Sequence, residues 1–278
     1  MSDSQVSVGA ALGYAWSLWR GHWREIWGVL ALNGLACTVL CAGVFANDPQ
    51  IQIAGVLGLL VTQYPTNGSI FRLAFAADHP GEERFALAHH GLQWRGIELK
   101  MLGAGALILL FSVVLTILMV LILMGGLGGL LYAHSIPLAT IMKTGDPFDA
   151  AGADGLQLES FGKTLIEFVL MVVWVRLSLA YAATADSDRV QVFRTWKLTR
   201  GNFWRLFLTT LVLELPSALI MGVGAAGTNM ALGAKSAPLA PAETFLYSLV
   251  CGGWLGAAAM PLAAGVQAYF YRNLKTAD

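Results

Sequence analysis

A Gly, a Trp and an Arg recur within three short stretches of this chain, each directly before a long apolar run. The stretches are residues 21–24, 91–95 and 201–205, and the apolar runs begin near Ile26, Leu99 and Leu206. Trp and Arg at these positions are typical of the point where a helix enters a bilayer. The recurrence of this Trp-Arg motif therefore predicts one helix–loop–helix unit that is used three times.

The chain is too apolar for a soluble domain. Of its 278 residues, 56% are hydrophobic and only 12% are charged, whereas a soluble domain carries roughly 25% charged residues. Its 17 basic and 17 acidic residues cancel, so no net field attracts nucleic acid. We therefore expect an all-α integral membrane protein that does not bind nucleic acid.

Apolar runs long enough to cross a bilayer occur six times. A hydrocarbon core of ~30 Å needs about 20 helical residues. The expected transmembrane helices cover 26–45, 51–71, 101–124, 164–183, 206–223 and 244–271. Pro65 lies among polar residues in the second, where we expect a kinked or broken helix with its freed carbonyls facing protein or water. Residues 130–142 are too few for another crossing and predict an interfacial or re-entrant helix on the outer side.

The basic residues predict the orientation. With the N-terminus inside, 14 of the 17 Lys and Arg residues lie on the inner side or at its membrane boundary, and only Lys143, Lys163 and Lys235 lie outside. Positive residues favour the cytoplasmic side. We therefore expect a multi-pass protein of a bacterial cytoplasmic membrane, with both termini in the cytoplasm.

The whole chain, 1–278, is expected to be a single membrane domain of three degenerate helical-hairpin repeats at about 8–78, 84–186 and 188–278. Each repeat runs from an amphipathic interfacial helix through a Trp-Arg motif and two transmembrane helices to an exit segment. The exit segments run from Arg72 to Asp78, from Arg176 to Asp186 and from Arg272 to Asp278. The alternative is that Trp and Arg simply recur at any interface without a repeat.

The stretch from Val175 to Ala180, followed by the run from Phe193 to Phe207, resembles a broad set of poorly characterised bacterial membrane proteins. They are related to the membrane domain attached to some glycerophosphodiester phosphodiesterases. The resemblance implies a six-helix membrane module. It does not imply the hydrolase activity, because no segment outside the membrane approaches the ~250 residues of that catalytic barrel.

Basic and aromatic residues gather near the inner surface and are the candidate contacts for lipid headgroups. They are Arg20, Trp23, Arg24, Trp94, Arg95, Arg194, Lys197, Arg200, Trp204 and Arg205. Such amphipathic segments bind anionic phospholipids, and the same surface could recruit an acidic protein partner. The structural alternative is that these residues only set the topology and extend their charged ends to the interface.

Polar residues within the apolar runs are candidates for a cavity. They are Glu214, Asn67, Arg176 and Asn33. An ionisable group at membrane depth is costly and marks a candidate functional site. Our hypothesis is that Glu214 lines a polar cavity near Pro65–Gly68. For Asn33 and Asn67 the pattern favours hydrogen bonds between helices over a role in the cavity.

Motifs of soluble enzymes are missing from the sequence. There is no His-Glu-x-x-His, no Gly-x-Ser-x-Gly and no phosphate-binding glycine loop, and Cys37, Cys41 and Cys251 have no further ligands beside them to form a metal site. We expect no cofactor. The pattern favours a non-enzymatic protein that handles, senses or transports lipids or other amphiphiles. The alternatives are a membrane scaffold that recruits a partner to its basic cytoplasmic face and an intramembrane lipid-modifying enzyme.

Overall fold

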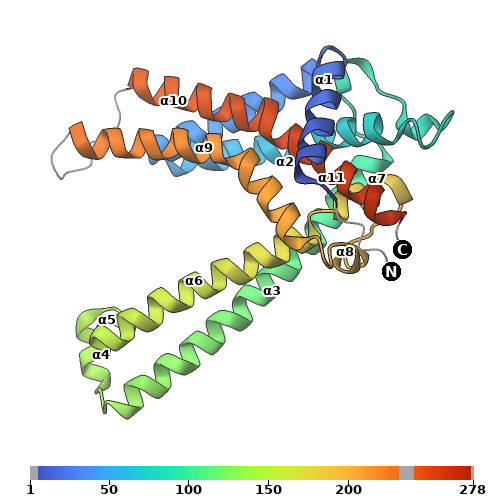
Figure 1. Ribbon diagram of the computed structural model, residues 1–278. Coiled ribbons are helices and arrows are strands. Elements are labelled where there is room, and N and C mark those ends of the chain that lie inside the picture. The colour runs from blue at the N-terminus through green and yellow to red at the C-terminus, as the bar shows by residue number, and fades with distance from the viewer. Residues whose placement is uncertain (1–5, 232–240, 277–278) are drawn as a thin grey trace. The chain divides into compact units, whose positions relative to one another are not determined.

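The computed structural model describes residues 6–231 and 241–276 and contains helices but no strand in these ranges. The helices are α1 (Val8–Phe45), α2 (Pro49–Phe75), η1 (Glu83–Phe85), η2 (His89–Gly91), α3 (Gly96–Ala133), α4 (Leu138–Thr144), α5 (Pro147–Ala150), α6 (Gly152–Leu177), α7 (Ala180–Ser187), α8 (Arg194–Leu198), α9 (Phe203–Ala231), α10 (Pro241–Trp254), η3 (Leu255–Ala259) and α11 (Met260–Lys275) (Figure 1). They form two compact units. The first comprises Met1–Ala104 with Ser178–Asp278, and the second comprises Gly105–Leu177.

Within residues 6–231 and 241–276, four helical segments are long and apolar enough to cross a membrane. They are Val8–Ala46, His89–Ala133, Gly152–Ser187 and Pro241–Lys275. The expected all-helical class with several membrane-length helices is therefore confirmed. The second and fifth expected transmembrane helices form α2 and α9, which are not among these four. Six crossings and a threefold repeat stay predictions, and the boundaries of the two compact units do not follow those of the repeats.

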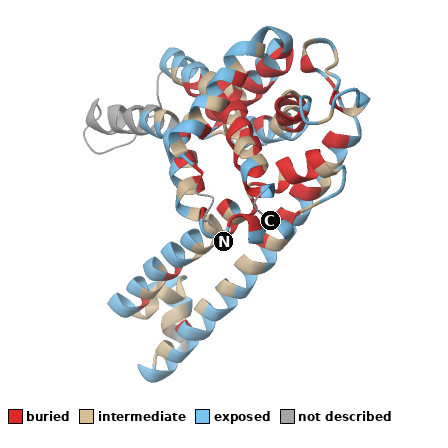
Figure 2. Cartoon of the chain, turned by 45° about the vertical axis from the view of Figure 1, so that its right-hand side comes forward, coloured by how far each residue is buried: buried red, intermediate tan, exposed pale blue. Residues whose placement is uncertain are grey.

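Burial differs between the two compact units (Figure 2). The first contains most of the buried residues, contributed mainly by α1, α2, α7 and α11. In the second, the long helices α3 and α6 carry many exposed apolar side chains, such as Ile122 and Phe161. Lipid would cover such side chains in a membrane, because large exposed apolar surfaces are rare in water-soluble monomers.

The prolines do not interrupt their helices. We expected a kinked or broken helix at Pro65. Helix α2 is continuous through Pro65, so the break is absent, and residues 64–72 are buried against protein as expected for the polar half of this helix. Helix α9 is likewise continuous through Pro216, and Figure 1 shows it changing direction along its length. A proline removes one backbone hydrogen bond and commonly bends a helix without ending it.

The glycine-rich stretch at Gly125–Gly129 does not end α3 either. The helix continues to Ala133 and is 38 residues long. The separate helix that we expected over 130–142 is therefore divided: residues 130–133 belong to α3, and α4 begins at Leu138. The helix persists because apolar surroundings give the backbone no other hydrogen-bond partners.

Helix α1 packs closely on the C-terminal helices of the chain. A side chain at Gly252 would overlap the backbone of Thr38, and one at Gly256 would lie 2.5 Å from the carbonyl oxygen of Asn33. These two glycines are four residues apart and form the small-residue face that permits such an approach. This glycine face packs against α1 of the same chain.

A π-turn, η3, separates α10 from α11, and α1 supplies its missing hydrogen-bond donors. Pro261 has no N–H, which leaves the carbonyl of Ala257 without its usual helical donor. The indole Nε1 of Trp19 donates to that carbonyl at 3.0 Å, and Asn33 Nδ2 donates to the carbonyl of Gly256 at 2.9 Å. Thr62 Oγ1 of α2 donates to Asn33 Oδ1 at 2.9 Å. Asn33 is fully buried and so links three helices, which confirms its expected role in bonding between helices.

We predict that Asn33→Ala lowers the free energy of unfolding by about 1–3 kcal/mol, because it leaves the Gly256 carbonyl without its donor from α1 and removes the bond to Thr62 of α2. Thermal or denaturant unfolding of the purified protein in detergent measures this. Asn273→Ala is the matched control, since Asn273 is exposed and bonds only within its own helix. Equal effects of the two substitutions would contradict the linking role of Asn33.

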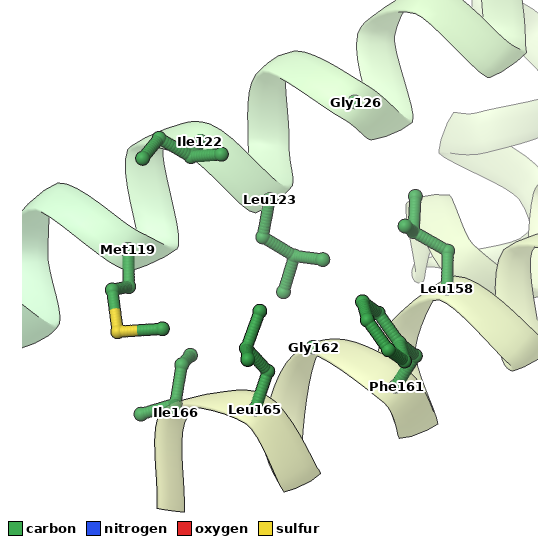
Figure 3. A pocket seen from close by; sticks show the side chains of 9 residues that line it. All are labelled: Met119, Ile122, Leu123, Gly126, Leu158, Phe161, Gly162, Leu165 and Ile166. Atoms are coloured by element: carbon green, nitrogen blue, oxygen red, sulfur yellow. The ribbon is translucent and has the colours of Figure 1, made fainter. Parts of the chain in front are cut away.

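The second compact unit contains an apolar groove of about 270 Å³ between α3 and α6. Met119 and Leu123 line it from α3, and Phe161 and Leu165 line it from α6 (Figure 3). Gly162 allows the helices to approach, because a Cβ there would lie 2.5 Å from a methyl carbon of Leu123. The groove has the apolar lining that suits a hydrocarbon chain.

Candidate functional site

The three Trp-Arg motifs adopt two backbone conformations. Gly91 and Gly201 have positive φ angles of 74° and 84°, which glycine adopts without strain, and each precedes the start of a long helix. Gly21 instead lies inside α1, which runs without interruption from Val8. The first motif therefore joins the expected amphipathic helix and transmembrane helix into one, whereas the other two follow short helical turns.

Most of the candidate headgroup contacts are exposed. Arg20, Trp23, Arg24, Trp94, Arg95, Arg194, Lys197, Arg200 and Trp204 all have exposed side chains. Arg24 lies over the ring of Trp23 at 5.5 Å. Arg205 is half-buried and donates to the carbonyl of Val6 at 3.1 Å. Nine of the ten residues are thus free to meet a membrane surface, and Arg205 has in addition a structural role.

A fully buried ion pair joins the end of α2 to the start of α3. Arg72 Nη2 lies 2.8 Å from each carboxylate oxygen of Glu98, and neither side chain is exposed. Glu98 Oε2 also accepts the backbone N–H of Arg95 at 2.9 Å, as a capping-box glutamate does at the start of a helix. Arg72 Nη1 donates to the carbonyl of Arg84. Gly68 makes room for the carboxylate, because a side chain there would overlap Glu98.

Sequence reasoning missed this pair. Arg72 was assigned to an exit segment at the inner interface, and Glu98 was not singled out. The available signal was Glu98 itself, an acidic residue three positions after Arg95, the residue that directly precedes α3, which is the capping-box spacing. Its partner on α2 could not be inferred from spacing, because 26 residues separate the two.

We predict that Glu98→Gln lowers the free energy of unfolding by about 3–5 kcal/mol, because it leaves the Arg72 guanidinium buried without a counter-charge. Arg72→Met should be similarly harmful, whereas the double variant Arg72→Met/Glu98→Gln should recover part of the loss. Unfolding of the four proteins in detergent gives the double-mutant cycle. Strict additivity of the two substitutions would show that the pair makes no such contribution.

The three exit segments contact one another in the first compact unit. Asp186 of α7 is buried and accepts from His79 Nε2 at 2.9 Å, from the Tyr271 hydroxyl at 3.0 Å and from Lys275 Nζ at 2.5 Å. Arg272 Nη2 lies 2.6 Å from Asp78. We call these residues the exit cluster: Asp78, His79, Asp186, Tyr271, Arg272 and Lys275. The cluster joins the end of α2 to α7 and to the C-terminal turn of α11.

We predict that Asp186→Asn costs about 1.5–3 kcal/mol of stability, since one carboxylate serves three donors, two of which, His79 and Lys275, can carry a positive charge. Asp78→Asn is the control, because its pair with Arg272 is more than one-third exposed on both sides and should contribute only about 0.2–1 kcal/mol. Thermal unfolding compares them. A larger loss from the Asp78 substitution would place the centre of the cluster elsewhere.

The four residues predicted to share a cavity lie on four different helices, and Arg176 belongs to a different compact unit from the other three. Asn67 is buried on α2 with its Oδ1 lacking a hydrogen-bond partner among the described residues. Glu214 is exposed on α9, whose principal neighbours are α10 and α1 and do not include α2. Arg176 is half-buried near the end of α6, in the second compact unit. The structure therefore does not bring Glu214 together with Pro65–Gly68, and Asn33 serves the packing described above.

Metal ligands do not cluster in the part of the chain that the structure describes, where no group of three or more His, Cys, Asp or Glu side chains is placed to hold an ion. Cys37, Cys41 and Cys251 are buried free thiols.

These features define a helical protein with several helices of membrane length and charged groups gathered at helix ends. No family model matches the chain. No curated protein and no solved structure matches it either. The resemblance to membrane domains of glycerophosphodiester phosphodiesterases therefore stays a prediction.

Proposed function

We propose that this chain is a non-enzymatic, multi-pass protein of a bacterial cytoplasmic membrane that handles lipids or other amphiphiles at the inner leaflet. The observation that carries the proposal is the exposure of nine of the ten aromatic and basic residues of the Trp-Arg motifs and their flanking segments. Exposed Trp and Arg near the ends of membrane-length helices suit anionic headgroups on one side and acyl chains on the other.

The proposed topology has six crossings and both termini in the cytoplasm. Two features of α2 support its crossing. Its first half exposes apolar side chains, including Ile53, Leu57 and Val61, and its second half buries polar ones. The exit cluster supports three hairpin repeats, because side chains from all three expected exit segments bond to one another.

The groove between α3 and α6 supports a lipid ligand. Its lining is apolar, and its volume of about 270 Å³ is near the lower end of the range for small-molecule sites. A hydrocarbon chain is the ligand that such a lining accepts at the least cost, because it leaves no polar group unpaired.

The rival function is a scaffold that recruits an acidic partner. Arg194, Lys197 and Arg200 favour it, because all three are exposed on or directly after the short helix α8. The same three cations would also attract an anionic membrane surface. Because the charges fit both functions, the experiment must measure bound lipid and bound protein in the same sample.

The experiment is mass spectrometry of lipids and proteins retained by the protein purified in detergent. We predict that the wild-type protein retains phosphatidylglycerol. Each basic residue near the surface contributes about 1 kcal/mol to the attraction of anionic lipid. A variant with Arg24, Arg194, Lys197 and Arg200 all changed to Gln should therefore retain at least about tenfold less.

Lys143→Gln with Lys163→Gln is the control, since both residues belong to the predicted outer side. Its lipid content should match the wild type. Absence of retained phospholipid, together with a stoichiometric protein partner that the four-residue variant loses, would replace lipid handling with the scaffold.

A further inference from the structure

A charged cleft of about 340 Å³ lies at the N-terminal end of α3, within the first compact unit. Residues from α2, η1, α3 and the end of α7 line it. Its charged lining consists of four cations and two carboxylates, namely Arg72, Arg84, Arg95, Lys100, Glu83 and Asp188. The exit cluster and the groove between α3 and α6 are separate features.

Most of the charges in this cleft already have partners. Arg72 is bound to Glu98 and to the carbonyl of Arg84, while Arg84 Nε lies 2.5 Å from Glu82. Lys100 Nζ lies 2.6 Å from Asp188 Oδ1. These contacts hold the walls of the cleft in place and leave part of the Asp188 carboxylate for another donor.

Arg95 and Glu83 are different. Within the ranges that the structure describes, neither side chain has a hydrogen-bond or ion-pair partner, although both line the same cleft. Their charges are opposite, yet they do not form an ion pair with each other. The cleft thus keeps one guanidinium and one carboxylate apart and available.

The separated charges select a ligand that carries both signs. Phosphate alone would be attracted by Arg95 and Lys100 but repelled by Glu83 and Asp188. A simple cation would be attracted by the two carboxylates but repelled by the two basic side chains. Guanidinium binds phosphate oxygens well, and carboxylates accept from an ammonium group. None of the described lining residues is aromatic, so a nucleotide base would find nothing to stack on.

The position of the cleft favours a lipid over a soluble molecule of the same chemistry. Lys100 is the last Lys, Arg, Asp or Glu before a run that contains none until Lys143. Leu99 and Leu102, beside it on α3, are 59% and 38% exposed, and Trp94 is 43% exposed. A headgroup in the cleft would therefore have apolar surface next to it for the glycerol backbone and the first methylenes.

We propose that this cleft binds the phosphoethanolamine headgroup of a phospholipid, with the phosphodiester at Arg95 and Lys100 and the ammonium at Glu83 and Asp188. The inference rests on the proposed lipid-handling function and names the headgroup class. Asp188 has a positive φ of 55° at the C-cap of α7, and its carboxylate lies against Lys100.

The test is a binding titration on the full-length protein in detergent with four probes. They are dihexanoyl phosphatidylethanolamine, dihexanoyl phosphatidylglycerol, glycerophosphoethanolamine and inorganic phosphate. The wild type should bind the ethanolamine lipid about tenfold more tightly than the glycerol lipid. Glu83→Gln should remove that preference, and Arg95→Gln should weaken both lipids about tenfold.

Two controls remove the same charges outside the cleft: Arg189→Gln next to Asp188, and Glu25→Gln in α1. Both residues are exposed, and both variants should bind like the wild type. Glu83 has no partner to lose, so its substitution tests the cleft without disturbing the fold. Asp188→Asn, which does lose Lys100, is used only together with a check of folding by circular dichroism.

The outcomes are distinct. Equal affinity of the wild type for the two lipids, an ethanolamine preference that survives in Glu83→Gln, or unchanged lipid affinity in Arg95→Gln overturns the inference and leaves lipid handling intact. If glycerophosphoethanolamine or phosphate binds as tightly as the ethanolamine lipid, the claim that the ligand is a lipid and not a soluble molecule is wrong. Failure of the wild type to bind either lipid removes the proposed function itself.

Discussion

The buried Arg72–Glu98 pair holds together the region on which the functional proposals depend. An arginine and a glutamate without solvent exposure are tolerated only when each satisfies the other, since an unpaired charge in such a place costs several kcal/mol. Here the guanidinium also binds the Arg84 carbonyl, and the carboxylate also caps α3. The pair thereby sets the register between α2, the loop that follows it and the first turn of α3.

Polar contacts of this kind recur wherever the helices of the first compact unit turn or break. Asn33 and Trp19 of α1 satisfy the carbonyls released at the π-turn, and Asp186 collects three donors from two other segments. In an apolar environment the hydrophobic effect gives little preference among helix arrangements, so close packing and hydrogen bonds between helices decide the arrangement. The glycines at 252 and 256 serve the same end, because they allow α1 close enough for Asn33 to bond.

Much of the helical organisation could be predicted from the sequence, and long-range pairing could not. Composition and run length identified the helical class, and the exposure of Trp23, Trp94 and Trp204 agrees with their expected place at an interface. One local rule failed because apolar surroundings outweighed it: α3 continues through Gly125–Gly129. Of the kink or break expected at Pro65, the break is absent, because tertiary packing holds α2 continuous there. The partners of Arg72 and Asp186 lie 26 to 107 residues away. The periodicity of a single sequence does not predict which residues pair across such separations along the chain.

The account is tested most directly by site-specific photocrosslinking in living cells. A benzophenone amino acid replaces Trp94, which is exposed and one residue from the unpaired guanidinium of Arg95. After irradiation and purification, intact mass spectrometry identifies what has been captured. The account predicts a phospholipid adduct at residue 94 that is richer in phosphatidylethanolamine than the adduct formed when the same amino acid replaces Tyr132, which is exposed on α3 far along the chain from the cleft. Capture of a defined protein at residue 94, with no lipid adduct, would contradict it.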